Sequence, residues 1–279
     1  KINTPSIDLY YERGLKNQQK VYANIVGSYA KVETGRNYIE YDNANTLFKE
    51  QFGLSSDKYS LIAEGIYEKG FTYGSLKFGA KHIQSFTKQE VQQNGVFKSD
   101  LNQMETSVFS EWNHSKDKFS CSLGLKANRV HFSNISINKS YYNFLPKAML
   151  GYRLNENSFI RYDVEMSQTN PTLVELTDTE IRLDPYLAER GNLLLKPYSN
   201  LNNNLFYEHK KGLFTFNANL RHHYKHNPIM ESVKEQGNIF LIIPENMKSW
   251  NKYNAEMNLK VGMIKNILQF SLTGGYNHF

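Results

Sequence analysis

The sequence contains only one cysteine and no long hydrophobic run. Cys121 is alone among 279 residues, so no disulfide can form within the chain. Its place in an alternating polar and apolar segment favours a small buried apolar role over catalysis. The longest apolar run, Ile239 to Ile243, is far shorter than the roughly 18 residues that a membrane-spanning helix requires. These absences exclude an intramolecular disulfide framework and a helical membrane topology.

Motifs of catalysis and cofactor binding are also missing. The sequence has no GxSxG, HExxH or CxxC motif and no glycine-rich phosphate loop. Serine and histidine occur, but no pattern pairs a nucleophile with a base. The net charge is +6, yet lysine and arginine are scattered rather than gathered in a block. We therefore expect no enzyme, no cofactor, no resident metal and no nucleic-acid partner.

Tyrosine and phenylalanine, in contrast, are abundant. The chain has 19 Tyr and 17 Phe but only 7 Pro, so these strand-favouring residues far outnumber the proline that interrupts strands. Charged residues still make up 22% of the chain, which leaves much of any sheet facing water. This composition indicates an all-β protein with many wet faces.

Apolar and polar side chains alternate along much of the chain. Within residues 213–224, Phe214, Phe216, Ala218 and Leu220 share one strand face, and Thr215, Asn217, Asn219 and Arg221 share the other. Residues 253–261 and 159–167 repeat this pattern. Such alternation fits either a soluble sandwich or a membrane barrel with a polar lumen.

The lengths of the connections favour the barrel. About a dozen strands are predicted, at residues 6–12, 20–32, 59–67, 75–86, 103–112, 119–132, 141–152, 158–168, 198–207, 213–224, 250–261 and 267–279. Short turns and longer connections alternate between them. The longer ones are residues 33–58, 87–102, 169–197 and 225–249, with an intermediate one at 133–140. Antiparallel strands place every second connection at the same end, so the pattern predicts the short periplasmic turns and long outer loops of a transmembrane β-barrel.

Aromatic residues near the predicted strand ends agree with a barrel, because amphipathic rings prefer the lipid headgroup boundary. They are Tyr10, Tyr29, Tyr59, Tyr67, Tyr141, Tyr152, Phe159, Tyr198, Tyr207, Tyr253 and Tyr276. Pro146 lies within a predicted strand although proline cannot donate to a ladder. We keep the strand and expect a bulge or a strand end there.

Two stretches, SFIRYDVEMSQTNPTLVEL and RGNLLLKPYSNLNNNLFYEHKKGLFTFNANLRHHYKHNPI, carry a recognisable pattern. They resemble the β-barrel of TonB-dependent outer-membrane receptors, especially those of Bacteroidetes. The family's glycine-asparagine-proline-asparagine-leucine-lysine-proline run is matched by Gly191, Asn192, Leu195, Lys196 and Pro197, whereas Leu193 and Leu194 depart from it. We expect this motif to mark the return from an outer loop to a strand. Glycine would permit an unusual backbone angle, and proline would bias the preceding lysine toward extended geometry.

The resemblance implies a larger assembly than this chain. Receptors of this family look like 22-stranded barrels with a plug. Residues 1–279 would then form part of a single outer-membrane barrel domain, with the plug, the TonB-binding segment and the remaining strands outside the chain. The implied location is the outer membrane of a Gram-negative cell. The implied partners are membrane lipid, the TonB complex, a small-molecule, glycan or peptide cargo, and in some related systems a surface lipoprotein.

Three groups of polar residues could carry binding chemistry. His222, His223 and His226 are a tempting metal site, but a strand directs the middle one away from the others, so polar rim residues are the preferred interpretation. Acidic residues crowd residues 169–197, where a solvated loop is favoured over capture of a cation; they are Glu175, Asp178, Glu180, Asp184 and Glu189. Asp163 and Glu165 beside Arg161 are expected to be ion-paired wall residues.

Two other functions remain open at this point. A complete, smaller outer-membrane barrel acting as a passive channel or adhesin would account for the alternation without missing parts. A soluble extracellular β-protein that binds carbohydrate with its aromatic residues would instead pack its apolar faces against each other. The favoured interpretation is the barrel of a TonB-dependent receptor that takes up a nutrient, with cargo contacts in residues 33–58, 169–197 and 225–249. Its motifs do not identify the cargo.

Overall fold

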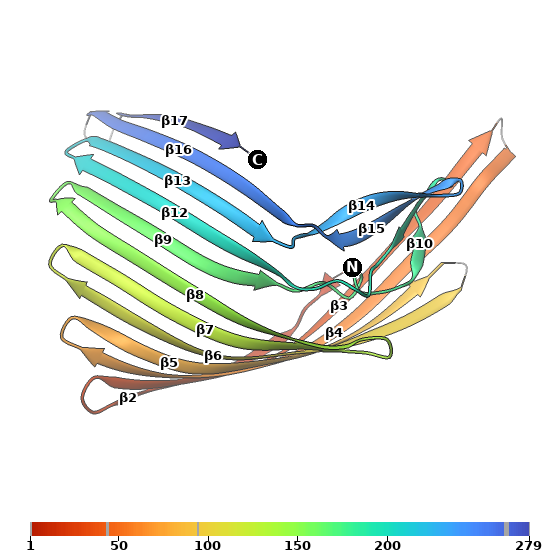
Figure 1. The fold of residues 1–279 in the computed structure, drawn as a ribbon, viewed down its shortest axis with the longest axis horizontal. Coiled ribbons are helices and arrows are strands. Elements are labelled where there is room, and N and C mark those ends of the chain that lie inside the picture. Colours follow the sequence, from red (N-terminus) through yellow and green to blue (C-terminus); the bar gives the residue numbers. More distant parts are fainter. Residues whose placement is uncertain (1, 43–44, 94, 265–267, 279) are drawn as a thin grey trace.

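The computed structural model describes residues 2–42, 45–93, 95–264 and 268–278. These residues form one large curved antiparallel sheet and one small sheet at its outer end (Figure 1). None of the described residues forms a helix long and apolar enough to cross a membrane. The expectation of an all-β, antiparallel chain is confirmed.

The large sheet, here called the wall, has 13 strands. Apart from β1, each strand pairs with the strand of this sheet that follows it in the sequence. They are β1 (Ile2–Asn3), β2 (Ser6–Leu15), β3 (Gln19–Asp42), β4 (Asn45–Phe71), β5 (Gly74–Gln92), β6 (Val96–Lys116), β7 (Phe119–Ser133), β8 (Asn138–Asn155), β9 (Ser158–Thr169), β12 (Tyr198–Lys211), β13 (Phe214–His226), β16 (Ser249–Ile264) and β17 (Leu268–His278). Because β1 and β2 both pair with β3, they are two pieces of one edge strand. Every predicted strand lies in this wall; of the last one, residues 267 and 279 lie outside the described part.

The predicted sidedness is also confirmed. Short turns at residues 16–18, 72–73, 117–118, 156–157 and 212–213 join the strands at one end. Figure 1 shows these turns together at the left, whereas the long connections extend to the right. An antiparallel wall with this asymmetry needs no crossover, since each strand pairs with the next one in the wall.

Two of the predicted loops are in fact strand extensions. The β3–β4 ladder continues through residues 33–42 and 45–58, and the β5–β6 ladder continues through residues 87–92 and 96–102. The prediction of loops was therefore wrong there. Beyond the membrane, both faces of a hairpin contact water or other polar segments of the protein. Apolar and polar side chains therefore no longer alternate there, although the backbone hydrogen bonds between the strands continue.

The two faces of the wall differ as the alternation predicts. On β7, the exposed residues Leu123, Leu125 and Ala127 alternate with the buried Gly124 and Asn128. Large apolar side chains on this outer face remain uncovered, and Val108, Phe144 and Met257 are 56–62% exposed. A soluble sandwich would bury such a face against a second sheet, whereas lipid covers it in a membrane barrel.

Pro146 lies inside β8 without a bulge. The β7–β8 ladder runs through it in register, opposite Leu125, so the expected irregularity is absent on that side. On the other side the β8–β9 ladder begins only at Lys147, paired with Glu165. Pro146 is therefore a strand end with respect to β9 alone, and β8 and β9 separate beyond it. The missing N–H falls where no ladder requires a donor.

A small sheet is built from the two longest connections. It consists of β10 (Glu180–Arg182), β11 (Leu187–Arg190), β15 (Ile239–Asn246) and β14 (Ile229–Gln236), in that order. Residues 169–197 and 225–249 were predicted as irregular loops, and this part of the prediction was wrong. The parallel pairing of β11 with β15 joins the two connections. Such a pairing depends on contacts distant in sequence, which no local pattern reveals.

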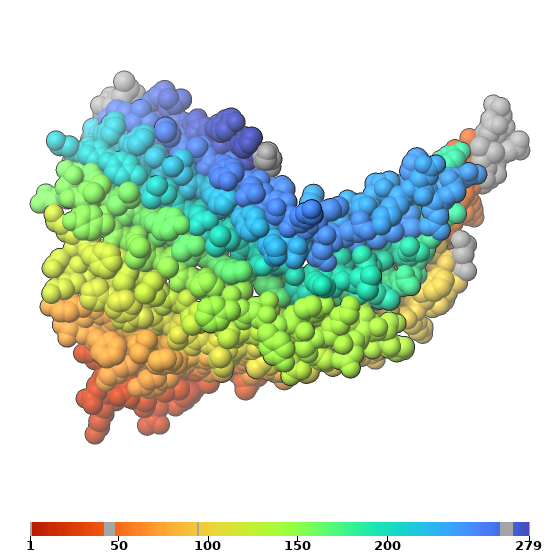
Figure 2. Space-filling view, viewed as in Figure 1, coloured from red at the N-terminus to blue at the C-terminus, as the bar shows by residue number. Residues whose placement is uncertain are grey.

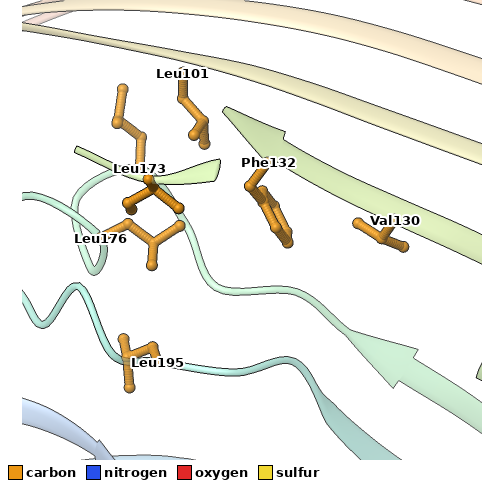
Figure 3. Packing of buried hydrophobic residues seen from close by; sticks show 7 residues of the cluster. Leu101, Val130, Phe132, Leu173, Leu176 and Leu195 are labelled. Carbon is orange, nitrogen blue, oxygen red and sulfur yellow. The ribbon is translucent and has the colours of Figure 1, made fainter. Parts of the chain in front are cut away.

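The main buried cluster lies between these connections and the wall. Inward residues of β6 and β7 meet residues of the 169–197 connection, and the members are Leu101, Val130, Phe132, Ile137, Leu173, Leu176 and Leu195. Figure 3 shows side chains of the wall strands and of the connection pointing toward one another. The connection is thus anchored to the inner face of the wall near its outer end. Figure 2 shows the two long connections, in teal and blue, lying against each other at the right.

Candidate functional site: the outer loop layer and the inner wall

The glycine of the motif is required by a close approach of backbone. A Cβ atom added to Gly191 would lie 2.3 Å from the carbonyl oxygen of Thr177, 2.6 Å from that of Val174 and 2.7 Å from that of Glu175. Gly191 is not among the residues with a positive φ. Our sequence-based explanation by an unusual backbone angle was therefore wrong, and the reason for glycine here is space.

Asn192 and Leu195 connect the motif to both outer connections. The Asn192 side chain donates from Nδ2 to the carbonyl of Pro244 in β15 at 3.0 Å and accepts at Oδ1 from the backbone N–H of Leu194 at 2.9 Å. The backbone N–H of Asn192 donates to the carbonyl of Glu175 at 2.6 Å. Leu195 is only 2% exposed and belongs to the buried cluster. The motif thus forms the junction of the two loops and the wall.

Lys196 and Pro197 complete this junction just before β12 begins. The backbone N–H of Lys196 donates to Oδ1 of Asn246 at 2.9 Å, and Nδ2 of Asn246 donates back to the carbonyl of Lys196 at 3.0 Å. The same nitrogen donates to the carbonyl of Asn227 at 2.8 Å. One amide therefore replaces a strand partner for the last residues of the connection. No local pattern marked Asn246 in the sequence, because its partners are distant in the chain.

Residues 169–197 and 225–249 together are called the loop layer. Replacing Asn246 with alanine should loosen this layer. The change leaves three backbone groups without their partner, and we expect a local cost of about 1–3 kcal/mol. Hydrogen exchange of the full-length protein in detergent should show faster exchange in residues 192–197 and 227–246. Asn37→Ala, at an exposed position of β3, is the matched control. Unchanged exchange around residue 246 would contradict the role of this amide.

A second contact fixes the small sheet to the outer extensions of the wall. The side chain of Gln93 donates to the carbonyl of Arg182 at 2.7 Å and accepts from its backbone N–H at 2.9 Å. Arg36 of β3 also donates to the carbonyl of Arg182, at 3.2 Å. Gln93 is only 7% exposed. Both backbone groups of Arg182, the last residue of β10, are therefore held by side chains that lie 89 or more residues away in sequence.

The β14–β15 hairpin, which lies outside the membrane-spanning part, carries a pH-sensitive contact. Lys234 Nζ lies 2.5 Å from Glu245 Oε1. Hydrogen bonds from Lys234 and Ser232 hold the pKa of the Glu245 carboxyl below its usual value of 4.5. A lowered pKa of an acid stabilises the hairpin above the unfolded pKa, and this stabilisation is lost as pH falls through the folded value.

We therefore expect the protection of the β14–β15 hairpin to be constant from neutral pH to about 5 and to decline below about 4.5. The measurement is hydrogen exchange of residues 229–246, corrected for the intrinsic rate at each pH. In Glu245→Gln the acidic decline should be reduced, since the neutral amide cannot be protonated in this range. A decline of equal size in the variant would show that other groups cause it.

The inner wall carries cross-strand ion pairs, as expected for a lumen. Arg161 and Asp163, two positions apart on β9, are paired at 2.9 Å, which agrees with our interpretation of them as wall residues. Glu165, which was also expected to be ion-paired, forms no ion pair with a described residue and instead lines a hollow of the wall. The other pairs on this face are Glu12–Lys20, Glu64–Lys81, Glu68–Lys77, Glu105–Lys126, Glu111–Lys147 and Arg221–Glu256. These side chains are partly exposed, so each pair contributes little stability. They give the lumen a polar surface with balanced charge.

A hollow of about 320 Å³ opens in the wall near the point where β8 and β9 separate. Its polar lining includes Lys147, Glu165 and Asn170. Both amide atoms of Gln168 and Oδ1 of Asn170 are buried there without a partner among the described residues. These groups can therefore accept hydrogen bonds from, and donate them to, whatever fills the lumen.

The structure separates the other residues that the sequence singled out. His222 bonds to Asn203 and Asn251, whereas His223 on the opposite face bonds to Asn202. Of the acidic residues, Glu175 accepts from Thr172 at the start of a single helical turn, Asp178 lies 3.9 Å from Arg190, and Asp184 accepts from Tyr186. Within the described ranges, no group of three or more His, Cys, Asp or Glu is arranged to hold a metal ion.

Comparisons with solved structures agree with this architecture. The copper transporter OprC superposes with a TM-score of 0.75 at 11% identity, over 98% of this chain and 46% of that one. The pyoverdine outer membrane receptor FpvA from Pseudomonas aeruginosa PAO1 gives 0.74 at 10% identity, over 99% and 44%. The ferric yersiniabactin uptake receptor FyuA from Yersinia pestis gives 0.66 at 11% identity, over 98% and 42%. The chain thus spans less than half the length of these proteins.

At these identities the likeness shows the fold alone, and the family comes from the sequence. No curated protein sequence matches the chain. The model of the outer membrane protein beta-barrel family matches residues 14–279. Together with the three neighbours, this match confirms the resemblance to the barrels of TonB-dependent receptors and the location in the Gram-negative outer membrane. The chain belongs to the outer membrane protein beta-barrel family.

Proposed function

We propose that this chain is part of the barrel of a TonB-dependent receptor that takes up a nutrient across the outer membrane by an energised mechanism. The observation that carries the proposal is a curved wall, apolar outside and polar inside, with a folded loop layer at its outer end only. A wall of this kind provides a path for polar solutes, and the loop layer provides a surface that meets them first.

The edges of the wall support a barrel that is larger than this chain. In the described residues the wall begins at β1 and β2 and ends at β17, and these edges do not pair with each other. Unpaired edge groups in lipid cost several kcal/mol each, because no water reaches them. We infer that further strands of the protein pair with both edges, and that a plug fills the space in front of the inner wall. The TonB-binding segment would belong to that plug-bearing part.

The cargo surface belongs, in this proposal, to the loop layer. Residues 169–197 and 225–249 are joined by the β11–β15 pairing and by the motif of Gly191, Asn192, Leu195, Lys196 and Pro197. The motif would act by holding this surface in place rather than by touching cargo. The β3–β4 extension, residues 33–58, stands beside it and is tied to it through Arg36. The Bacteroidetes subgroup remains a prediction.

The test uses the full-length protein and its deletion strain. The deletion strain should lose growth on one limiting nutrient from a panel of ferric siderophores, cobalamin, glycans and peptides, and the cloned gene should restore it only in cells with active TonB. Restoration that is independent of TonB would favour the passive channel. A heat-modifiable band in the outer-membrane fraction is the control for assembly, because closed barrels resist unfolding in detergent at low temperature.

The passive channel remains the second candidate. A complete twelve-stranded channel would pair its first strand with its last, and the described edges lack this pairing. It would also have no need of a loop layer anchored by a buried cluster. A cross-link between cysteines placed at Leu9 in β2 and Leu272 in β17 of the full-length protein would support this candidate, because it requires the two edges to be adjacent.

A further inference from the structure

The outer face of the wall carries a polar patch directly beside its apolar surface. One cross-strand row on this face consists of Ala80, Val108, Ala127 and Phe144, which are in register on β5, β6, β7 and β8. The next row toward the outer end consists of His82, Thr106, Arg129 and Tyr142, again in register. His131 and Ser140 follow in the row beyond. The six residues His82, Thr106, Arg129, His131, Ser140 and Tyr142 are called the outer patch.

The position of the outer patch corresponds to the edge of the hydrocarbon layer. Arg129 lies twelve residues beyond Asp117 in the short turn that precedes β7. At about 3.3 Å per residue and a tilt of about 40°, this is roughly 30 Å along the barrel axis. The apolar band of outer-membrane barrels is about 25 Å tall. The boundary between the two rows is thus the boundary between hydrocarbon and lipid headgroups.

The side chains of the outer patch are held in place by one another. Arg129 Nη2 donates to Ser140 Oγ at 3.2 Å, and His131 Nδ1 lies 3.0 Å from the same oxygen. His82 Nδ1 lies 2.8 Å from Thr106 Oγ1. The Arg129 guanidinium stands 6.0 Å from the centre of the Tyr142 ring. Both imidazoles use Nδ1 in these bonds, and within the described residues Nε2 of each ring makes no hydrogen bond.

No carboxylate on the same face neutralises the outer patch. Arg129 forms no ion pair with any described residue, although most lumen charges are paired. On β4 the outward residues beside the patch are Ala63 and Leu61, which carry no charge. The nearest outward carboxylate on β6, Asp100, lies three outward positions beyond Thr106 and is in register with Lys88. A lone guanidinium flanked by two imidazoles at a membrane surface attracts anions.

We propose that the outer patch binds the phosphate of a phosphorylated lipid headgroup in the outer leaflet. The planar guanidinium of Arg129 matches two phosphate oxygens. When Nδ1 of His82 and of His131 accepts from its neighbouring hydroxyl, Nε2 of each ring carries the proton and can donate to further phosphate oxygens. His82 lies two strands from Arg129, roughly 10 Å away, and His131 lies about 7 Å away along β7. This spread suits a headgroup with two phosphates better than a single small anion. The apolar row beneath receives the acyl chains.

The binding is independent of transport, so its test needs no cargo. The full-length protein in detergent is titrated with a bisphosphorylated glucosamine disaccharide lipid, and binding is followed by native mass spectrometry. We expect Arg129→Gln to weaken binding by roughly tenfold or more, the loss typical of a charge-assisted hydrogen bond. Arg221→Gln removes the same charge from the inner face, where Arg221 is paired with Glu256 at 3.6 Å. This control should bind as the wild type does.

Two further arms identify the ligand and the role of the histidines. The same lipid without phosphates should bind at least tenfold more weakly, and inorganic phosphate at millimolar concentration should not compete. His82→Ala/His131→Ala should bind the bisphosphorylated lipid more weakly than the wild type does, because two hydrogen-bond donors are lost. Arg129→Lys keeps the charge without the planar fork and should give an intermediate affinity.

Three results would overturn the proposal. They are wild-type binding by Arg129→Gln, equal binding of the dephosphorylated lipid, and full competition by inorganic phosphate, which would mark the patch as a site for the free anion. If Arg129→Gln fails to assemble, Arg129→Lys carries the test, and wild-type affinity of that variant would overturn the proposal equally.

Discussion

Replacing Gly191 with alanine should detach the outer loop layer while the wall remains assembled. The new methyl group would lie 2.3–2.7 Å from three backbone carbonyl oxygens, those of Val174, Glu175 and Thr177. None of these can turn aside as a side chain can. We expect a local cost of about 3 kcal/mol or more, the upper end for overpacking. This corresponds to an increase in the opening of the layer by roughly two orders of magnitude.

Hydrogen exchange of the full-length protein measures this effect directly. Residues 172–197 and 229–246 should exchange faster together, because Asn192 beside Gly191 donates to the carbonyl of Pro244 in the second connection. Wall strands such as β6 and β7 should keep their protection. Gly65→Ala is the matched control, since a Cβ atom there meets nothing within 4 Å. An equally small change in both variants would show that the close approach at Gly191 is not needed for the layer.

Shortening Leu195 to alanine should have a comparable effect through a different cause. Leu195 is 2% exposed and packs in the cluster with Leu101, Val130 and Phe132 of the wall. Truncation of a buried leucine costs about 2–5 kcal/mol, because a cavity remains where the side chain was. The layer should therefore open at least about thirtyfold more often. In the proposed receptor this would lower cargo affinity while leaving the barrel heat-modifiable.

The adjacent Leu194 provides a control of the same residue type. Leu194 is 75% exposed, so Leu194→Ala removes few contacts and should change the opening of the layer by less than about 0.5 kcal/mol. The two variants are compared by hydrogen exchange and by protease cutting within residues 170–197. Because both replace leucine with alanine, any difference between them reports the effect of burial and not of residue type. Similar behaviour of Leu194→Ala and Leu195→Ala would contradict the anchoring of the motif in the buried cluster.

The two variants also distinguish the motif from a cargo contact. If Gly191 and Leu195 act by holding the loop layer, each substitution should raise loop exchange and lower cargo affinity in the same proportion. If the motif touched cargo itself, affinity would fall without a change in exchange. This comparison needs a cargo identified by the growth panel, whereas the exchange measurement alone tests the anchoring.

Much of the wall could be predicted from the sequence because its signal is local. A strand with one face in lipid and the other in a polar lumen must alternate apolar and polar residues. In segments such as Phe214–His226, the polarity of each residue therefore indicates which face its side chain occupies. The turn lengths likewise predict the sidedness, since antiparallel strands repeat their ends regularly. The inward pair of Arg161 and Asp163 followed from the same alternation.

The outer part could not be predicted in the same way. The extensions of β3 to β6 lose the alternation where no face meets lipid, although their ladders continue. The strands β11 and β15 find each other across some fifty residues of sequence, and their pairing has no local pattern. Asn246 and Gln93 matter through backbone partners on other segments, so neither residue is conspicuous in the chain.

By itself the sequence determined that this protein is an antiparallel barrel wall with one short-turn end and one long-loop end, because lipid imposes its requirement on every second side chain. Only the tertiary structure decided why Gly191 is glycine, which residues close the loop layer, and that Arg129 has no carboxylate partner among the described residues. Those properties depend on distances between segments far apart in the chain. Such distances exist only after the wall has brought its strands into register.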